Sequence, residues 1–148
     1  MPHHEYFMGV LPILMRLIHI LSAITLLGGV FAWRFGALAS GANLASDTRA
    51  KVENAFAAAW RPAVLASVIG LLVSGFYNFM QKVGAGGLQP AYHAVFGVKF
   101  LLALHVFAAT LLATKPNNPK RERMLTGVVA SGVIVVVLAV ILRTLGPQ

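Results

Sequence analysis

Cysteine is absent from this sequence and acidic residues are scarce: the 148 residues include no Cys and only four Asp or Glu. Without thiols the chain forms neither disulfide bonds nor thiolate metal sites, so any metal ligands have to come from its five histidines, its methionines or its carboxylates. The acids are Glu5, Asp47, Glu53 and Glu122, and all of them lie outside the long apolar stretches. This distribution argues against a carboxylate proton relay in a membrane and against a hydrolase site built on two carboxylates.

Apolar residues dominate instead. Hydrophobic side chains make up 58% of the chain and charged ones 11%, a composition typical of membrane proteins. Four apolar stretches, at about 12–33, 62–80, 92–114 and 124–143, each have roughly the 20 residues that cross a bilayer. The start "MPHHEYF" has no Lys or Arg and no small-residue cleavage site follows it before the second stretch, so we expect the first span to be retained. The sequence predicts one all-α membrane domain over 1–148, a four-transmembrane-helix antiparallel bundle.

Basic residues are concentrated in two of the three connections. The connections before the second and fourth spans hold four Lys or Arg each, whereas the opposite side has Lys82 and Arg143. The positive-inside rule then puts both basic connections in the cytoplasm and both termini outside, as in a protein of the bacterial inner membrane. The net charge of +8 calls for no nucleic acid, because topology and attraction to anionic lipid explain it. The eight residues are Arg34, Arg49, Lys51, Arg61, Lys115, Lys120, Arg121 and Arg123.

The first basic connection contains a further helical segment. Residues 46–60, "SDTRAKVENAFAAAW", open with Ser46 and Asp47 as capping residues and continue with Ala-rich sequence, which predicts a short surface helix. Pro62 then suits the first turn of the second span. Small residues within the spans predict close helix contacts and leave room for a flat cofactor. They are Gly28, Gly29, Gly70, Ser74, Gly75, Ser131 and Gly132.

Polar side chains interrupt two of the spans. In the first span Arg16 and His19 lie one helical turn apart, and the third span carries His93, Lys99 and His105. On a helix that turns about 100° per residue, the three residues of the third span point roughly 120° away from one another and cannot all line one site. Because His19 and His105 both fall near the middle of their spans, we expect His105 to face the bundle interior at the depth of His19.

Two histidines at matching depth on two membrane helices, with no thiolate or acid nearby, are typical of axial ligation of haem b. We predict that His19 and His105 bind the haem iron, with His93 as the reserve ligand. Arg16 and Lys99 would pair with the anionic propionates of the haem. The structural alternative is that His19 hydrogen-bonds a neighbouring helix and that Arg16 extends to the outer headgroups.

Three segments resemble one family. Residues 17–36, "LIHILSAITLLGGVFAWRFG", look like the first span of the copper-resistance protein D group and the related J-type protoporphyrinogen oxidases, which share a His, a Gly pair and a following basic residue. Here those residues are His19, Gly28, Gly29 and Arg34. "LLVSGFYNF" and "FGVKFLLALHVFAA" are similar to the second and third spans, with Lys99 matching a lysine in mid-helix. The resemblance covers nearly the whole chain and implies a four-helix membrane protein that holds haem b. The J-type oxidases place their third-span histidine differently relative to the lysine, so the scaffold and His19 alone are transferred.

Three functions from different classes remain. The first is a haem b electron carrier or oxidoreductase, the second a copper-handling membrane protein, and the third a structural subunit of a larger membrane complex. For copper, His3 and His4 would form a weak Cu(II) site once Met1 is removed. Tyr77 and Asn78 either contact a quinone or anchor the second span at the interface. Besides the lipid bilayer, the expected partners are a quinone or a redox protein and a second copy of the chain.

Overall fold

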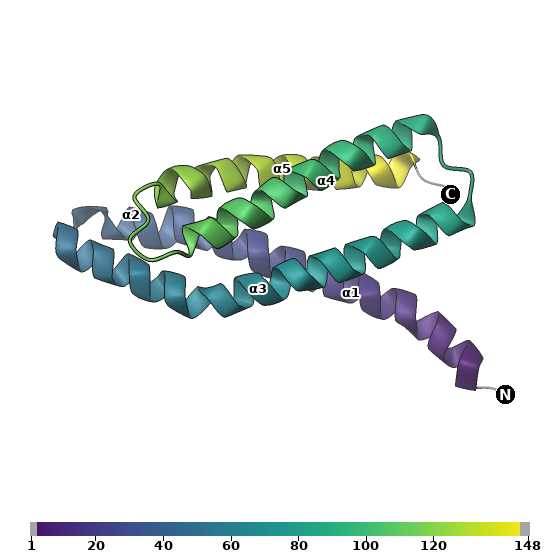
Figure 1. Cartoon of the computed structure of the whole chain (residues 1–148), viewed down its shortest axis with the longest axis horizontal. Helices are drawn as coiled ribbons and strands as arrows, with labels where there is room; N and C mark the ends of the chain where they lie inside the picture. The colour runs from purple at the N-terminus through teal and green to yellow at the C-terminus, as the bar shows by residue number, and fades with distance from the viewer. Residues whose placement is uncertain (1–2, 146–148) are drawn as a thin grey trace.

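The computed structural model describes residues 3–145, with side chains from residue 9 onward, and every regular element in that range is helical (Figure 1). The first long helix, α1 (His3–Phe31), continues through a π-helical segment, η1 (Ala32–Ala37), into the short helices α2 (Leu38–Ser40) and η2 (Gly41–Asn43). The other long helices are α3 (Ser46–Ala85), α4 (Pro90–Ala113) and α5 (Arg121–Leu145).

Four of these helical stretches are long and apolar enough to cross a membrane: residues 9–43, α3, α4 and α5. Large apolar side chains cover their outer faces, and Ile24, Phe76 and Leu101 are 63%, 69% and 67% exposed. Lipid tails are as apolar as these side chains, so their exposure is favourable in a bilayer. The prediction of an all-α bundle of four membrane-spanning helices is confirmed, and the chain is a multi-pass membrane protein.

The bundle consists of two helix pairs. Helix α1 packs mainly against α3, and α4 packs mainly against α5, whereas fewer contacts join α1 to α5 and α3 to α4. Figure 1 shows that the N-terminal half of α1 diverges from the other helices. The chain ends and the α3–α4 connection lie at one end of the bundle, which we refer to as the terminal end (Figure 1). The other end, formed by residues 34–61 and 115–123, carries eight Lys or Arg and is referred to as the basic end.

The core is most completely buried toward the basic end. Trp33 in η1 is 0% exposed, and its ring packs edge-on to Trp60 of α3 with the ring centroids 5.5 Å apart. Phe56 of α3 completes this aromatic cluster, 5.1 Å from Trp33 between ring centroids. Gly29 makes the approach possible, because a Cβ at that position would overlap the Trp60 ring. Apolar residues of α1, α3 and α5 extend the core: Leu26, Val30, Val64, Leu125 and Val128.

Residues 46–60 are helical as predicted, but they do not form a separate surface helix. Helix α3 runs unbroken from Ser46 to Ala85 with Pro62 inside it, so Pro62 does not begin a span. The proline removes one backbone hydrogen bond, and the helix continues because Trp60 before it and Val64 after it both pack into the same core. The predicted capping is also wrong: the N-cap is Ala45, and no side chain caps the helix.

Candidate functional site

His19 lies at the contact between α1 and α3. Its Nδ1 atom is 3.0 Å from Oγ of Ser74, a side chain of α3 that is completely buried. The Ser74 hydroxyl donates its only proton to the backbone carbonyl of Gly70, one turn earlier in α3. The hydroxyl therefore accepts from His19, and this network puts a proton on Nδ1 of the imidazole. In the neutral ring, Nε2 then carries a free lone pair.

Small residues of α3 let α1 approach this closely. A Cβ on Gly70 would overlap the hydroxyl of Ser22 in α1. A Cβ on Gly75 would lie 3.4 Å from Cε1 of His19, at the limit of van der Waals contact. The position of the imidazole thus depends on the small residues at positions 70, 74 and 75. The sequence predicts close helix contacts at these positions.

Lys99 is the residue of α4 that approaches His19. The rings of Phe79 on α3 and Phe96 on α4 stack with centroids 4.2 Å apart, which fixes the register of the two helices. Because these helices are antiparallel, Lys99 lies beside the turn of α3 that contains Gly75. The half-buried Lys99 acts electrostatically on the His19 ring. The imidazole of His19 and the ammonium group of Lys99 therefore lie within electrostatic range of each other.

His105 lies elsewhere on α4. It is exposed and lines a groove between α4 and α5 together with Lys120 and Arg123. It follows Lys99 by six positions, which places it about 9 Å further along the helix and roughly 120° around it. Lys99 faces the α1–α3 pair, so the expectation that His105 faces the bundle interior beside His19 is wrong for this arrangement. Ligation of iron by His105 stays a prediction.

Two further candidates, Arg16 and His93, are exposed near the terminal end. Within the part of the chain whose side chains are described, Arg16 forms no ion pair. The ring of His93 meets that of Tyr92 edge-on at 5.9 Å between centroids. Among the described side chains, neither residue forms a hydrogen bond with His19, and their roles as propionate partner and reserve ligand stay predictions.

The remaining sequence candidates concern copper and quinone. The side chains of His3 and His4 lie outside the described residues, and so does the Cu(II) site expected of them. Tyr77 accepts a hydrogen bond of 3.0 Å from Nε2 of Gln81 one turn later in α3. Asn78 is half-buried. Contact of Tyr77 and Asn78 with a quinone stays a prediction.

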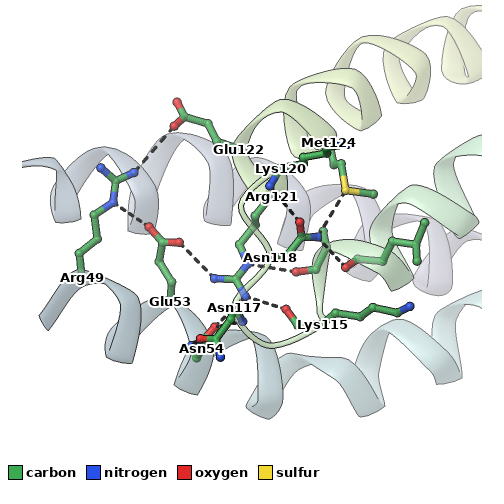
Figure 2. A network of polar contacts seen from close by, with 12 residues as sticks. Arg49, Glu53, Asn54, Lys115, Asn117, Asn118, Lys120, Arg121, Glu122 and Met124 are labelled. Carbon is green, nitrogen blue, oxygen red and sulfur yellow. Dashed lines mark hydrogen bonds and ion pairs between the residues drawn. The ribbon is translucent and has the colours of Figure 1, made fainter. Parts of the chain in front are cut away.

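A polar network at the basic end, missed by sequence reasoning, joins the two helix pairs (Figure 2). Arg121, the first residue of α5, is only 3% exposed. Its Nη1 lies 3.1 Å from the Glu53 carboxylate, its Nη2 donates to Asn54 at 2.9 Å, and its Nε donates to the carbonyl of Ala113 at 3.1 Å. The guanidinium also lies over Trp33, with Cζ 5.5 Å from the ring centroid.

The neighbouring acids are shared between arginines. Glu53 also pairs with Arg49 at 2.7 Å, and Glu122 pairs with Arg34 at 3.2 Å and with Arg49 at 3.8 Å. Buried charges are tolerated when they are paired in this way. Because each arginine of the network has an acidic partner, we interpret it as structural. The sequence shows the basic residues of this network, and they indicate the orientation in the membrane. Their pairing with acids on other helices is visible only in the fold.

Comparison of the chain with protein-family models, with curated proteins and with solved structures finds no match in any of the three. The resemblance to the copper-resistance protein D group therefore stays a prediction. Among the described residues, no group of three or more His, Cys, Asp or Glu side chains is arranged to hold a metal ion. The candidate site is thus centred on His19, with Ser74 behind the ring and Lys99 nearby.

Proposed function

We propose that this protein binds haem b within the membrane through His19 and serves as an electron carrier or a haem-dependent oxidoreductase. The observation that carries the proposal is the hydrogen bond between His19 Nδ1 and Ser74, at 3.0 Å. A histidine that ligates a metal donates its other ring N–H to a second group, which fixes the tautomer and the ring orientation. Ser74 supplies that acceptor, and Nε2 is left as the ligand atom.

The charges around His19 suit a haem as well. Haem propionates are anionic, and Lys99 supplies an ammonium group within electrostatic range of His19. A cation within the membrane requires a polar or anionic partner, and none of the ion pairs between described side chains involves Lys99. Arg16, one turn before His19, adds a second cation toward the terminal end. In this proposal Lys99 and Arg16 pair with the propionates.

The proposal names one residue that would bind the haem iron, His19, and the spin state of the iron would report whether the chain supplies a second. His105 lines the α4–α5 groove, so α4 would have to turn by about 120° and shift by about 9 Å along its axis for His105 to take the place of Lys99 beside His19. A single histidine leaves the iron five-coordinate and high-spin, whereas a second strong ligand makes it low-spin. Bound haem supplies one-electron chemistry, and the chain holds the imidazole, pairs the propionates and keeps water away.

Absorption spectra of the detergent-purified protein, oxidised and reduced, test this proposal. We expect wild type expressed with a haem supply to show the bands of a b-type haem, and His19→Ala to lose most of them. His93→Ala is the matched control, because His93 is an exposed histidine in the first turn of α4 and Lys99 lies between it and His105 in the sequence. A colourless wild type, or a His19→Ala variant that keeps the full wild-type spectrum, would show that the proposal is wrong.

We further propose that the basic end faces the cytoplasm of a bacterium and that both termini face outward. The eight Lys and Arg at the basic end support this orientation. Lys99 lies nine positions after Pro90, the first residue of α4, and fourteen positions before Ala113, its last residue. The site then lies in the outer half of the membrane, where a quinone or a redox protein on the outer side would exchange electrons with it.

A further inference from the structure

We propose that the groove between α4 and α5 at the basic end is a binding site for an anionic phospholipid. The groove has a volume of about 440 Å³ and is lined in part by Ala109, Leu112 and Gly127. Lys120 and Arg123 line it as well. Its walls therefore combine an apolar surface with two cations, and this combination matches a molecule that has an anionic head and an apolar tail.

The cations of the groove have no acidic partners among the described side chains. Glu53 and Glu122 are taken up by Arg34, Arg49 and Arg121, and Lys120 and Arg123 take part in none of these pairs. Both side chains are exposed at the start of α5, where a membrane helix meets the headgroups. Each such cation adds to the attraction toward an anionic lipid surface.

The groove also runs along the helices far enough to hold part of an acyl chain. His105, at its inner end, precedes the end of α4 at Ala113 by eight residues, which corresponds to about 12 Å along the helix. A second hollow of about 330 Å³ adjoins the groove, shares Leu112 and Met124 with it, and adds Lys115. A soluble anion would occupy only the part of the groove near Lys120 and Arg123. The acyl chain of a phospholipid would also occupy the apolar part of the groove.

Gly127 offers a way to test the tail separately from the head. A Cβ at Gly127 would meet nothing within 4 Å, so a larger side chain there would project into free space within the groove. Gly127→Leu thus reduces the room for an acyl chain and leaves both cations in place. Gly97→Leu on α4 is its control, since a Cβ at Gly97 also meets nothing within 4 Å and Gly97 does not line the groove.

Native mass spectrometry of the purified full chain, titrated with phosphatidylglycerol or phosphatidylcholine, measures the site. We expect phosphatidylglycerol to bind more tightly, and the double variant Lys120→Gln with Arg123→Gln to lose about tenfold or more in its affinity. The control removes the same charge outside the groove: Lys51→Gln with Arg61→Gln, two exposed cations of the basic end. Gly127→Leu should weaken binding of the long-chain lipid, and Gly97→Leu should not.

Three results would overturn the proposal. The first is an equal loss of affinity in the two double variants, because general surface charge would then explain the binding. The second is equal affinity for phosphatidylglycerol and phosphatidylcholine in wild type. The third is displacement of phosphatidylglycerol by inorganic phosphate at the same concentration, which would mean that the groove recognises a free anion without its tail. None of these results bears on haem binding at His19.

Discussion

The guanidinium of Arg121 lies over the ring of Trp33 at 5.5 Å from Cζ to the centroid, while its Nη1 pairs with Glu53 at 3.1 Å. A single side chain at the start of α5 therefore touches the extension of α1 and the helix α3. It adds a buried ion pair to the apolar core residues of α1, α3 and α5 that also join the two helix pairs. The stability of the four-helix arrangement is thus expected to depend strongly on this residue.

Arg121→Ala should lower the free energy of unfolding by about 3 kcal/mol, because it leaves Glu53 partly buried with one arginine partner fewer. Arg121→Lys should recover only part of the loss, since an ammonium cannot make the forked contacts of a guanidinium. Trp33 and Trp60 are the two tryptophans of the chain, so their fluorescence during unfolding in mixed micelles measures the change. Arg123→Ala, at an exposed position, should change stability by no more than about 0.5 kcal/mol. Equal effects of the two alanine variants would contradict the role given to Arg121.

Gly28 and Gly29 provide a matched pair for the packing of α1 on α3. A Cβ on Gly29 would overlap the Trp60 ring, whereas one on Gly28 would meet nothing within 4 Å. Gly29→Ala should therefore destabilise the protein by about 1–3 kcal/mol through overpacking. Gly28→Ala should be neutral or stabilise the helix by up to about 1 kcal/mol. Thermal unfolding in detergent distinguishes them, and a Gly29→Ala variant as stable as wild type would refute this packing.

Ser74→Ala tests the hydrogen bond that orients His19. Removing the acceptor should weaken haem binding about 10- to 100-fold while leaving the iron ligand in place. Ser67→Ala is the control, because Ser67 is also a buried serine on α3 and forms no described bond to His19. Haem titration of the two purified variants measures the difference. If both variants bind haem as wild type does, Ser74 does not orient a ligand.

Lys99→Met tests the electrostatic contribution of the ammonium group near His19. A positive charge near haem favours the reduced iron, so its removal should lower the reduction potential and loosen haem binding. Lys82→Met removes a lysine in the last turn of α3, beside the α3–α4 connection, and should leave the potential unchanged. Redox titration followed by absorption measures both variants. An unchanged reduction potential in Lys99→Met would show that the charge of this lysine does not act on the haem.

Reporter fusions test the orientation in the membrane. Alkaline phosphatase attached after Gln148 should be active in the periplasm, because the positive-inside rule keeps the basic end in the cytoplasm. The same enzyme inserted after Asn118, in the α4–α5 connection, should be inactive. The reverse pattern of activities would place the basic end outside.

Composition and hydropathy were sufficient to predict four membrane helices, because a bilayer imposes both their length and their apolarity. Helical spacing also gave the angle between Lys99 and His105 correctly, but spacing alone does not say which of two faces turns inward. The contact of Phe79 with Phe96 and the burial of Val106 give that information, and both require the packed structure. For this reason His105 was assigned to the wrong side of α4.

The sequence predicts the region where helices pack closely, but it does not identify the individual residues that make the contact. Gly28 and Gly29 are neighbours in the sequence, yet they point about 100° apart on the helix, and only Gly29 meets Trp60. The Arg121 network was beyond sequence reasoning for a different reason. Arg121 and Glu53 are 68 residues apart in the sequence, and no local pattern connects a loop cation with a particular acid on another helix.

The pairing of α1 with α3 and of α4 with α5 has a consequence for biogenesis. Both pairs join consecutive spans, so each can form as soon as its second helix has left the ribosome. Glu53 and Trp33 belong to the first pair and enter the membrane before Arg121 is synthesised. The α1–α3 hairpin can therefore form before Arg121 is available, and the joint at the basic end can form only once the start of α5 has been synthesised.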